Sequence, residues 1–271
     1  MTTDMTVTAE RIRAWYQKLQ FPKEYDEAFE QALATIPISE DITLETYDNG
    51  EPDGKRNLLS FLYLCEHTAT LYRQWGIPEE ILLDSLSDIP RWTQVWSGVE
   101  GTLCLRELGW LKCTLSGKLI KLGRLQYERG GAWEEVPEYG IKKGDTVLSI
   151  HIPRGERLTP EACKASLAQA RAFFATYFPE YPYQYFVCDT WLLGSELKEM
   201  LPPESNILAF QQLFDIVKQL PADDILRYTM RWNIARDEVK AFPCTNAFTR
   251  EIQRRALAGE PFHVGVGVIE K

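Results

Sequence analysis

His151 is the residue whose position in the sequence bears most directly on chemistry. It stands near the end of an alternating β-forming run, 147–152, that stops at Pro153, and it is the only histidine on a predicted central strand. Alternation puts it on one strand face with Val147 and Ser149, at the end of the strand where open α/β sheets bind ligands. An imidazole changes protonation near neutral pH, which suits a general base. The alternative is a structural histidine with its hydrogen bonds satisfied.

A row of polar side chains lies on the preceding predicted strand, 119–128. Arg124, Gln126 and Glu128 alternate with apolar residues and are therefore expected to share one face. Polar groups on an internal strand must be hydrogen-bonded or line a cavity. We therefore predict that Arg124 and Gln126 bind substrate and that Glu128 is a second candidate base. If this strand lies at the sheet edge, the row is simply solvated.

Asp189 ends a third predicted strand, 185–189. Its carboxylate either binds a substrate amine or caps the helix that follows. Metal chemistry is not expected, because the six cysteines form no C-x-x-C pair and the three histidines complete no zinc pattern. The cysteines are interpreted as buried, reduced thiols.

The elements that position these residues form two groups. Apolar spacing predicts a helix over 55–75 that ends at Gly76, within a helical region of about 115 residues. After Gly117 the pattern changes to strands alternating with helices, at 119–128, 147–152, 160–178, 185–189, 206–220, 245–257 and 262–269. Thr159 and Pro160 are a strong start for the helix at 160–178. This order predicts an α+β chain, with an all-α domain at 1–115 and a mixed-sheet domain at 116–271 whose central strands are parallel.

The overall composition excludes several classes of protein. The chain has 271 residues, 45% of them hydrophobic, which is enough for a full-sized core. Its formal net charge of −9 argues against non-specific binding to nucleic acid. No apolar stretch approaches the ~20 residues of a membrane span, and the first residues do not form a signal peptide. We therefore expect a cytoplasmic protein that binds neither membranes nor nucleic acid, and the sequence leaves the oligomeric state open.

Several segments, in order along the chain, resemble one bacterial family. Those in the second half are 119–128 (LIKLGRLQYE), 147–153 (VLSIHIP), 174–179 (FATYFP), 188–193 (CDTWLL) and 205–214 (SNILAFQQLF). Those in the first half are 61–66 (FLYLCE), 76–80 (GIPEE), 88–92 (DIPRW) and 107–111 (ELGWL). Together they are similar to acyltransferases with an α-helical N-terminal domain and a GNAT-like C-terminal domain. The resemblance implies a GNAT-like mixed sheet flanked by helices over 116–271.

This resemblance also implies a co-substrate, acyl-CoA or acetyl-CoA. GNAT proteins hold the pyrophosphate on a loop of pattern Q/R-x-x-G-x-G/A before a helix, and the equivalent loop here offers Arg154, Gly155, Arg157 and Thr159. Arg154 matches the first position, whereas Arg157 and Thr159 replace small residues. The two arginines are able to contact phosphate directly. The alternative is a solvated, charged turn.

The sequence therefore predicts an acyl-CoA-dependent N-acyltransferase. His151 and Glu128 are its candidate catalytic residues, and a small molecule with an amine or hydroxyl group is the acceptor. The alternative is a GNAT-like module that binds or senses a ligand without catalysis, which the altered phosphate loop favours.

Overall fold

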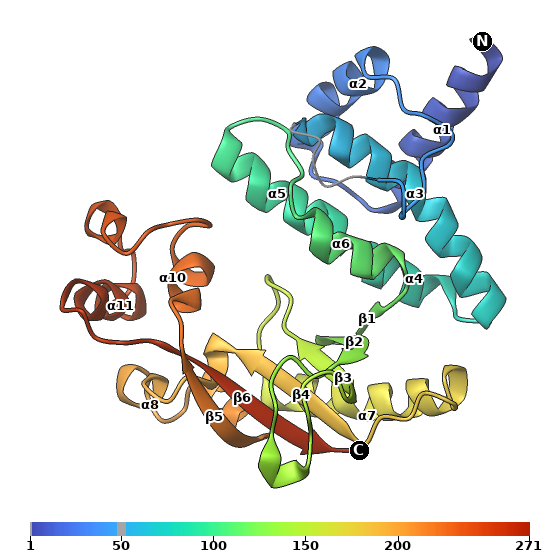
Figure 1. Cartoon of the computed structure of the whole chain (residues 1–271). Coiled ribbons are helices and arrows are strands. Elements are labelled where there is room, and N and C mark those ends of the chain that lie inside the picture. The colour runs from blue at the N-terminus through green and yellow to red at the C-terminus, as the bar shows by residue number, and fades with distance from the viewer. Residues whose placement is uncertain (1, 48–52) are drawn as a thin grey trace. The chain divides into compact units, whose positions relative to one another are not determined.

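The computed structural model describes residues 2–47 and 53–271. The chain divides into two units, residues 1–122 and 123–271, each with its own internal packing (Figure 1). The first is called the N-terminal unit here and the second the C-terminal unit. The sequence predicted a domain boundary between residues 115 and 116, and that boundary stays a prediction.

The N-terminal unit consists of helices followed by one short strand. The helices are α1 (Thr2–Lys18), α2 (Asp26–Thr35), α3 (Gly54–Trp75), α4 (Glu79–Leu86), α5 (Asp88–Glu100) and α6 (Leu108–Leu115), with a 3-10 turn η1 (Lys23–Tyr25) and the strand β1 (Leu119–Leu122). The helix predicted over 55–75 is confirmed as α3. Asp53 caps it by accepting hydrogen bonds from the backbone N–H groups of Lys55 and Arg56, and Gly76 ends it with a φ of 69°.

The C-terminal unit contains the strands β2 to β6 and the remaining helices. The strands are β2 (Leu125–Gly131), β3 (Thr146–His151), β4 (Tyr185–Thr190), β5 (Asp215–Pro221) and β6 (His263–Glu270). The helices are α7 (Pro160–Tyr177), α8 (Leu197–Met200), α9 (Asn206–Gln211), α10 (Asp224–Thr229) and α11 (Ala247–Leu257), with 3-10 turns η2 (Pro137–Tyr139), η3 (Trp191–Leu193) and η4 (Glu238–Ala241).

The sheet has the order β1-β2-β3-β4-β6-β5. Strands β2 and β3 are antiparallel, β3 and β4 are parallel, and β6 runs antiparallel to both β4 and β5. The predicted fold class is thus confirmed: helices come first, and a mixed sheet with a parallel centre follows. The helix α7 makes the crossover between β3 and β4, and it begins as predicted, because the Thr159 Oγ1 accepts a hydrogen bond from the Ala162 N–H at 3.3 Å.

Two predicted elements were wrong in detail. The strand predicted over 119–128 is a β-hairpin, since Gly123 adopts a φ of +65° and turns the chain between β1 and β2. Arg124 therefore lies in the turn and not on the strand that carries Gln126 and Glu128. The helix predicted over 206–220 ends at Gln211, and β5 follows it. Pairing of β5 with β6 decides this segment, because tertiary contacts override a short apolar pattern.

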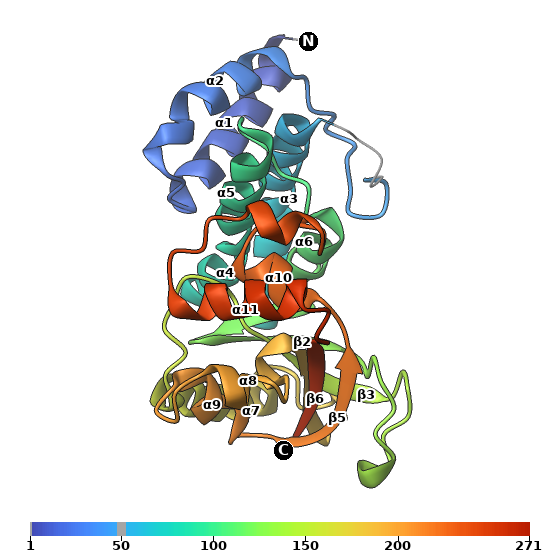
Figure 2. The same ribbon diagram turned by 90° about the vertical axis from the view of Figure 1, so that its left-hand side faces the viewer.

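One face of the sheet packs on helices, and α7, α8 and α9 lie together on one side of it in Figure 2. The Ser166 Oγ of α7 accepts from the Leu125 N–H at 3.1 Å and lies 3.0 Å from the Tyr127 hydroxyl. On β6 the glycines allow a close approach, because a Cβ on Gly265 would lie 2.3 Å from the Leu193 carbonyl oxygen.

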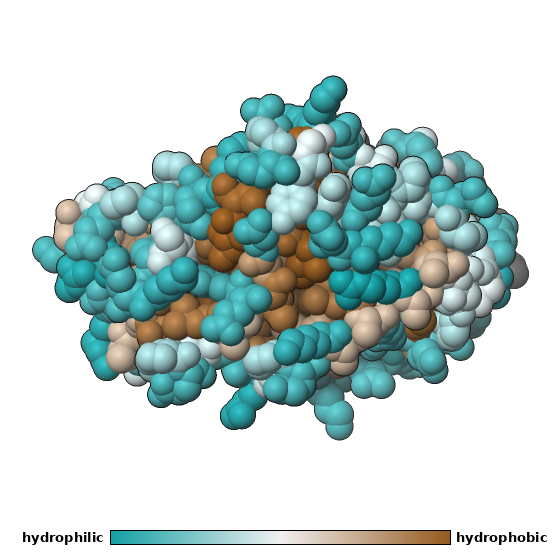
Figure 3. Space-filling model, turned by 90° about the horizontal axis from the view of Figure 1, so that it is seen from below, coloured by the Kyte–Doolittle hydropathy of each residue, from teal (hydrophilic) through white to brown (hydrophobic). Residues whose placement is uncertain are grey.

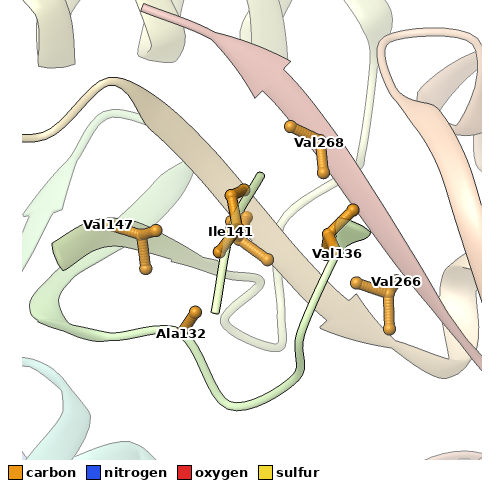
Figure 4. Close-up of a cluster of buried hydrophobic side chains, with 7 residues drawn as sticks. Ala132, Val136, Ile141, Val147, Val266 and Val268 are labelled. Atoms are coloured by element: carbon orange, nitrogen blue, oxygen red, sulfur yellow. The ribbon is translucent and has the colours of Figure 1, made fainter. Parts of the chain in front are cut away.

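The opposite face carries a second apolar cluster, drawn in Figure 4. Val136 and Ile141 of the β2–β3 connection lie over β3, β4 and β6. The full cluster is Ala132, Val136, Ile141, Val147, Val187, Val266 and Val268. Apolar side chains therefore cover much of both faces of the central strands.

The surface is mostly hydrophilic. Figure 3 shows one face of the molecule, on which polar side chains surround apolar ones near the centre. The large apolar side chains with the most exposure are Val7, Val99, Trp133 and Leu257. Within residues 2–47 and 53–271 no helix has both the length and the apolar character that a membrane span requires.

Candidate active site at the split between β3 and β4

The two parallel central strands separate before they end. Their pairing consists of Leu148 with Phe186 and Ser149 with Val187. Beyond this point each strand pairs only on its other side, His151 with Gln126 of β2 and Asp189 with Val266 of β6. The sheet therefore splits toward the carboxyl ends of β3 and β4, where ligands of open α/β sheets bind.

The register brings the predicted polar residues to one face beside this split. Residues directly opposite in a ladder point the same way, so Glu128 shares its face with Ser149, and Gln126 shares its face with His151. Asp189 is two residues after Val187, which belongs to the apolar cluster of that same face. Val147, Val187, Val266 and Val268 lie on the same face as these polar groups.

His151 and Glu128 form a direct pair. The His151 Nε2 lies 3.0 Å from the Glu128 Oε2, and the two side chains are 25% and 13% exposed. When Nε2 donates its proton to the carboxylate, Nδ1 is the nitrogen that holds the lone pair. A carboxylate that fixes the tautomer and orientation of an imidazole is the usual support of a general base. The catalytic roles of both residues stay predictions.

Asp189 has a different environment. The sequence left open that Asp189 caps the next helix, and this alternative is wrong. The Thr190 Oγ1 accepts a hydrogen bond from the Leu192 N–H and caps η3. The Asp189 Oδ1 is buried and accepts no hydrogen bond from the residues that the structure describes. Burial raises the pKa of Asp189 to about 6, with a smaller contribution from Glu134, while His151 and Lys218 lower it.

Lys218 and Glu134 are two charged neighbours of Asp189 that the sequence did not reveal. The Lys218 Nζ lies 2.9 Å from the Glu134 Oε2, which joins β5 to the β2–β3 connection. Lys218 fell within the helix predicted over 206–220, and its place on a strand beside β6 depends on tertiary pairing. Alternation along 215–221 is the one signal that could have indicated it.

Arg124 supports the loop between β3 and α7. Its Nε donates to the Arg157 carbonyl at 3.1 Å and its Nη2 to the Glu156 carbonyl at 3.0 Å. Two carbonyls held by one guanidinium fix the path of this loop. Gln126 is buried, with a residual exposure of 2%. The predicted substrate-binding roles of Arg124, Gln126 and Asp189 remain predictions.

The loop itself presents the four residues predicted to bind phosphate. Gly155 adopts a φ of +105°, a conformation that favours glycine. The Arg154 guanidinium donates to the Tyr228 carbonyl of α10, the Arg157 side chain is exposed, and Thr159 caps α7. The positive end of the α7 dipole is thus close in sequence to two arginines at the carboxyl end of β3. Their role toward phosphate also stays a prediction.

Over the described ranges, no group of three or more His, Cys, Asp or Glu side chains is arranged to hold a metal ion. The polar side chains beside the split include an imidazole and carboxylates. This set is able to move a proton and to bind amide and ammonium groups.

Comparison with known protein families assigns both halves of the chain. A model of a GNAT-like C-terminal domain matches residues 119–269, and a model of an N-acyltransferase N-terminal domain matches residues 5–117. The chain belongs to this family. The resemblance drawn from the sequence is confirmed for both halves. A comparison with curated proteins gave no match.

Solved structures share the GNAT-like architecture over nearly the whole chain. One is an acyltransferase in complex with decanoyl-CoA and teicoplanin, with a TM-score of 0.79 and 23% identity over 96% of this chain and 88% of that one. A mutant acyltransferase in complex with octanoyl-CoA has a TM-score of 0.79 and 22% identity over the same shares. An acyltransferase with CoA and 10C-teicoplanin has a TM-score of 0.77 and 22% identity over 95% and 87%. At these identities the likeness establishes the fold.

Proposed function

We propose that this GNAT-like protein transfers an acyl group from acyl-CoA to an amine of a small molecule. The observation that carries the proposal is the split between β3 and β4, with the His151–Glu128 pair at its edge. A general base beside an opening in a parallel sheet is what acyl transfer to an amine requires.

The residues around the split suit the parts of acyl-CoA. The carboxyl ends of β3 and β4 lie beyond the last residues that pair the two strands, and their backbone is able to bind the amides of the pantetheine arm, because a strand edge accepts an extended ligand. The first turn of α7, with Arg154 and Arg157 nearby, is able to bind the pyrophosphate. Relatives of the same fold bound to octanoyl-CoA and decanoyl-CoA support a fatty acyl group as the cargo.

In this reaction His151 accepts the proton of the attacking amine at Nδ1, while Glu128 stabilises the imidazolium through Nε2. The amine nitrogen forms a bond to the thioester carbon, and the carbon–sulfur bond then breaks. The CoA thiolate leaves with the electron pair of that bond and is protonated by His151 or by water. Amide and free CoA are the products, and no redox step is needed.

The experiment compares the contributions of two histidines, His151 and His67, to binding and to turnover. Octanoyl-CoA binding is measured by thermal shift, and release of free thiol is measured with methylamine as a simple acceptor. We expect His151→Gln to keep octanoyl-CoA binding and to lower the rate roughly 10²- to 10⁴-fold, the usual contribution of a general base. The matched control is His67→Gln, which changes an exposed histidine on α3.

A protein that is not stabilised by millimolar octanoyl-CoA would contradict the proposal, because a ligand at 100 times its dissociation constant stabilises a fold by ~2.7 kcal/mol. Binding without turnover in the wild-type protein would instead support the second candidate, a GNAT-like binding or sensing module. Arg157 and Thr159, which replace small residues of the loop pattern, favour that second candidate.

A further inference from the structure

The Asp189 carboxylate lies at the split, near the carboxyl end of β4. Its Oδ1 is buried, and the described residues give it no hydrogen bond. A buried carboxylate oxygen without a donor costs free energy, so a native structure keeps one only where something else supplies the donor. The missing donor indicates a ligand.

The position of Asp189 indicates which ligand. It lies two residues beyond Val187, the last β4 residue paired with β3, and shares a sheet face with His151. The charged and titratable groups that act on it are Glu134 from the β2–β3 connection, His151 from β3 and Lys218 from β5. Lys218 is 2.9 Å from Glu134, which leaves its charge shared between the two carboxylates.

We infer that Asp189 binds the ammonium group of the acceptor and presents it to His151. This inference rests on the proposed acyl transfer and adds a specificity-determining residue to it: a primary amine that is protonated in solution is preferred over a neutral nucleophile. An ammonium group supplies the donor that the Oδ1 lacks, and its positive charge offsets the cost of a buried carboxylate.

The step balances in protons and electrons. The ammonium group gives one proton to His151 and becomes a neutral amine with a free electron pair. His151 passes this first proton to solvent. The electron pair forms the bond to the thioester carbon as the bond to sulfur breaks, and a second proton moves from the nitrogen through His151 to the leaving thiolate. Asp189 remains a carboxylate throughout and acts on binding, so its removal should raise the KM for the amine more than it lowers kcat.

Two small nucleophiles that differ in charge test whether Asp189 recognises the positive charge of the acceptor. Methylamine is a cation at neutral pH, whereas hydroxylamine is almost entirely neutral, and both are small. Free thiol released from octanoyl-CoA is measured with each nucleophile for the wild-type protein and for Asp189→Asn, which keeps the size of the side chain and removes its charge. We expect the ratio of kcat/KM for methylamine to kcat/KM for hydroxylamine to fall roughly 10- to 100-fold, mainly through the KM of methylamine.

The control is Asp237→Asn, an exposed carboxylate of the same unit at the start of η4. It should keep the wild-type ratio.

An unchanged ratio in Asp189→Asn would overturn the inference. So would a loss of octanoyl-CoA affinity in that variant with no effect on the amine, since the missing donor would then be an amide of the pantetheine arm. Wild-type protein that binds octanoyl-CoA and releases no thiol with methylamine would overturn it too. Failure of the wild-type protein to bind octanoyl-CoA at all would instead contradict the proposed function.

Discussion

At the scale of single residues, the site combines one satisfied pair and one unsatisfied group. The His151 Nε2 and the Glu128 Oε2 are hydrogen-bonded to each other at 3.0 Å. Among the described residues, the Asp189 Oδ1 has no hydrogen-bond partner, and the pKa of Asp189 is raised to about 6 from an ordinary value of 3.8, chiefly by burial. Groups that are costly to the fold and lie at a strand end are more often kept for binding or catalysis than for stability.

This cost leads to a prediction on stability. Because the folded protein holds the Asp189 proton more tightly than the unfolded chain does, the free energy of unfolding should fall as the pH rises from about 4 to about 6. Above that window the charged carboxylate destabilises the fold, so Asp189→Asn should stabilise the protein at pH 8 by roughly 1–3 kcal/mol. At pH 5 the gain should be smaller. Urea denaturation at both pH values measures it.

The control for that measurement is again Asp237→Asn, which should show no difference between the two pH values. If Asp189→Asn were less stable than the wild-type protein at pH 8, the carboxylate would have a donor in the folded state. The inference about the acceptor ammonium would then lose its structural basis.

At the scale of elements, the sequence correctly predicted those helices and strands whose formation depends on residues close together in the chain. The helix α7 was predicted from Thr159 and Pro160, because a cap depends on neighbours in sequence. The strand β5 was missed, because it is a strand through its pairing with β6, which is more than 40 residues away in sequence. Alternation along the strands predicted which residues share a sheet face with Glu128 and with His151. It could not predict that the Asp189 carboxylate lacks a hydrogen-bond donor. That fact depends on every element around the carboxylate at once.

The last strand offers a prediction at this scale. Gly265 on β6 lies against the buried Leu193, whose carbonyl oxygen would be 2.3 Å from an added Cβ. Gly265→Ala should therefore displace η3 from the sheet and cost at least about 1–3 kcal/mol in the free energy of unfolding. Thermal denaturation followed by circular dichroism measures the loss.

The matched control is Gly98→Ala in α5, where nothing lies within 4 Å of the added Cβ. That change should stabilise its helix slightly, by about 0.5–1 kcal/mol, because alanine is the better helix former. Equal effects of the two substitutions would mean that the close packing of β6 on η3 does not contribute to stability.

At the scale of the whole molecule, an acidic chain is proposed to bind an anion. The formal net charge is −9, so the overall field opposes a CoA phosphate, and attraction must come from a small region. The carboxyl ends of β3 and β4 and the first turn of α7 are that region, since α7 is the crossover between the two strands. Binding should therefore stabilise a defined part of the C-terminal unit.

Hydrogen exchange followed by mass spectrometry tests this distribution in the full chain. Octanoyl-CoA should slow the exchange of backbone amides in β3, β4 and the first turn of α7, because a bound ligand suppresses local opening of the segments it contacts. The fall in exchange should be lost when Arg157→Ala removes one cation of the loop, and it should persist in Arg250→Ala, which removes an exposed arginine of α11. Slower exchange confined to residues 2–47 and 53–122 would place the acyl donor outside the split sheet, and the roles proposed for His151, Glu128 and Asp189 would fall with it.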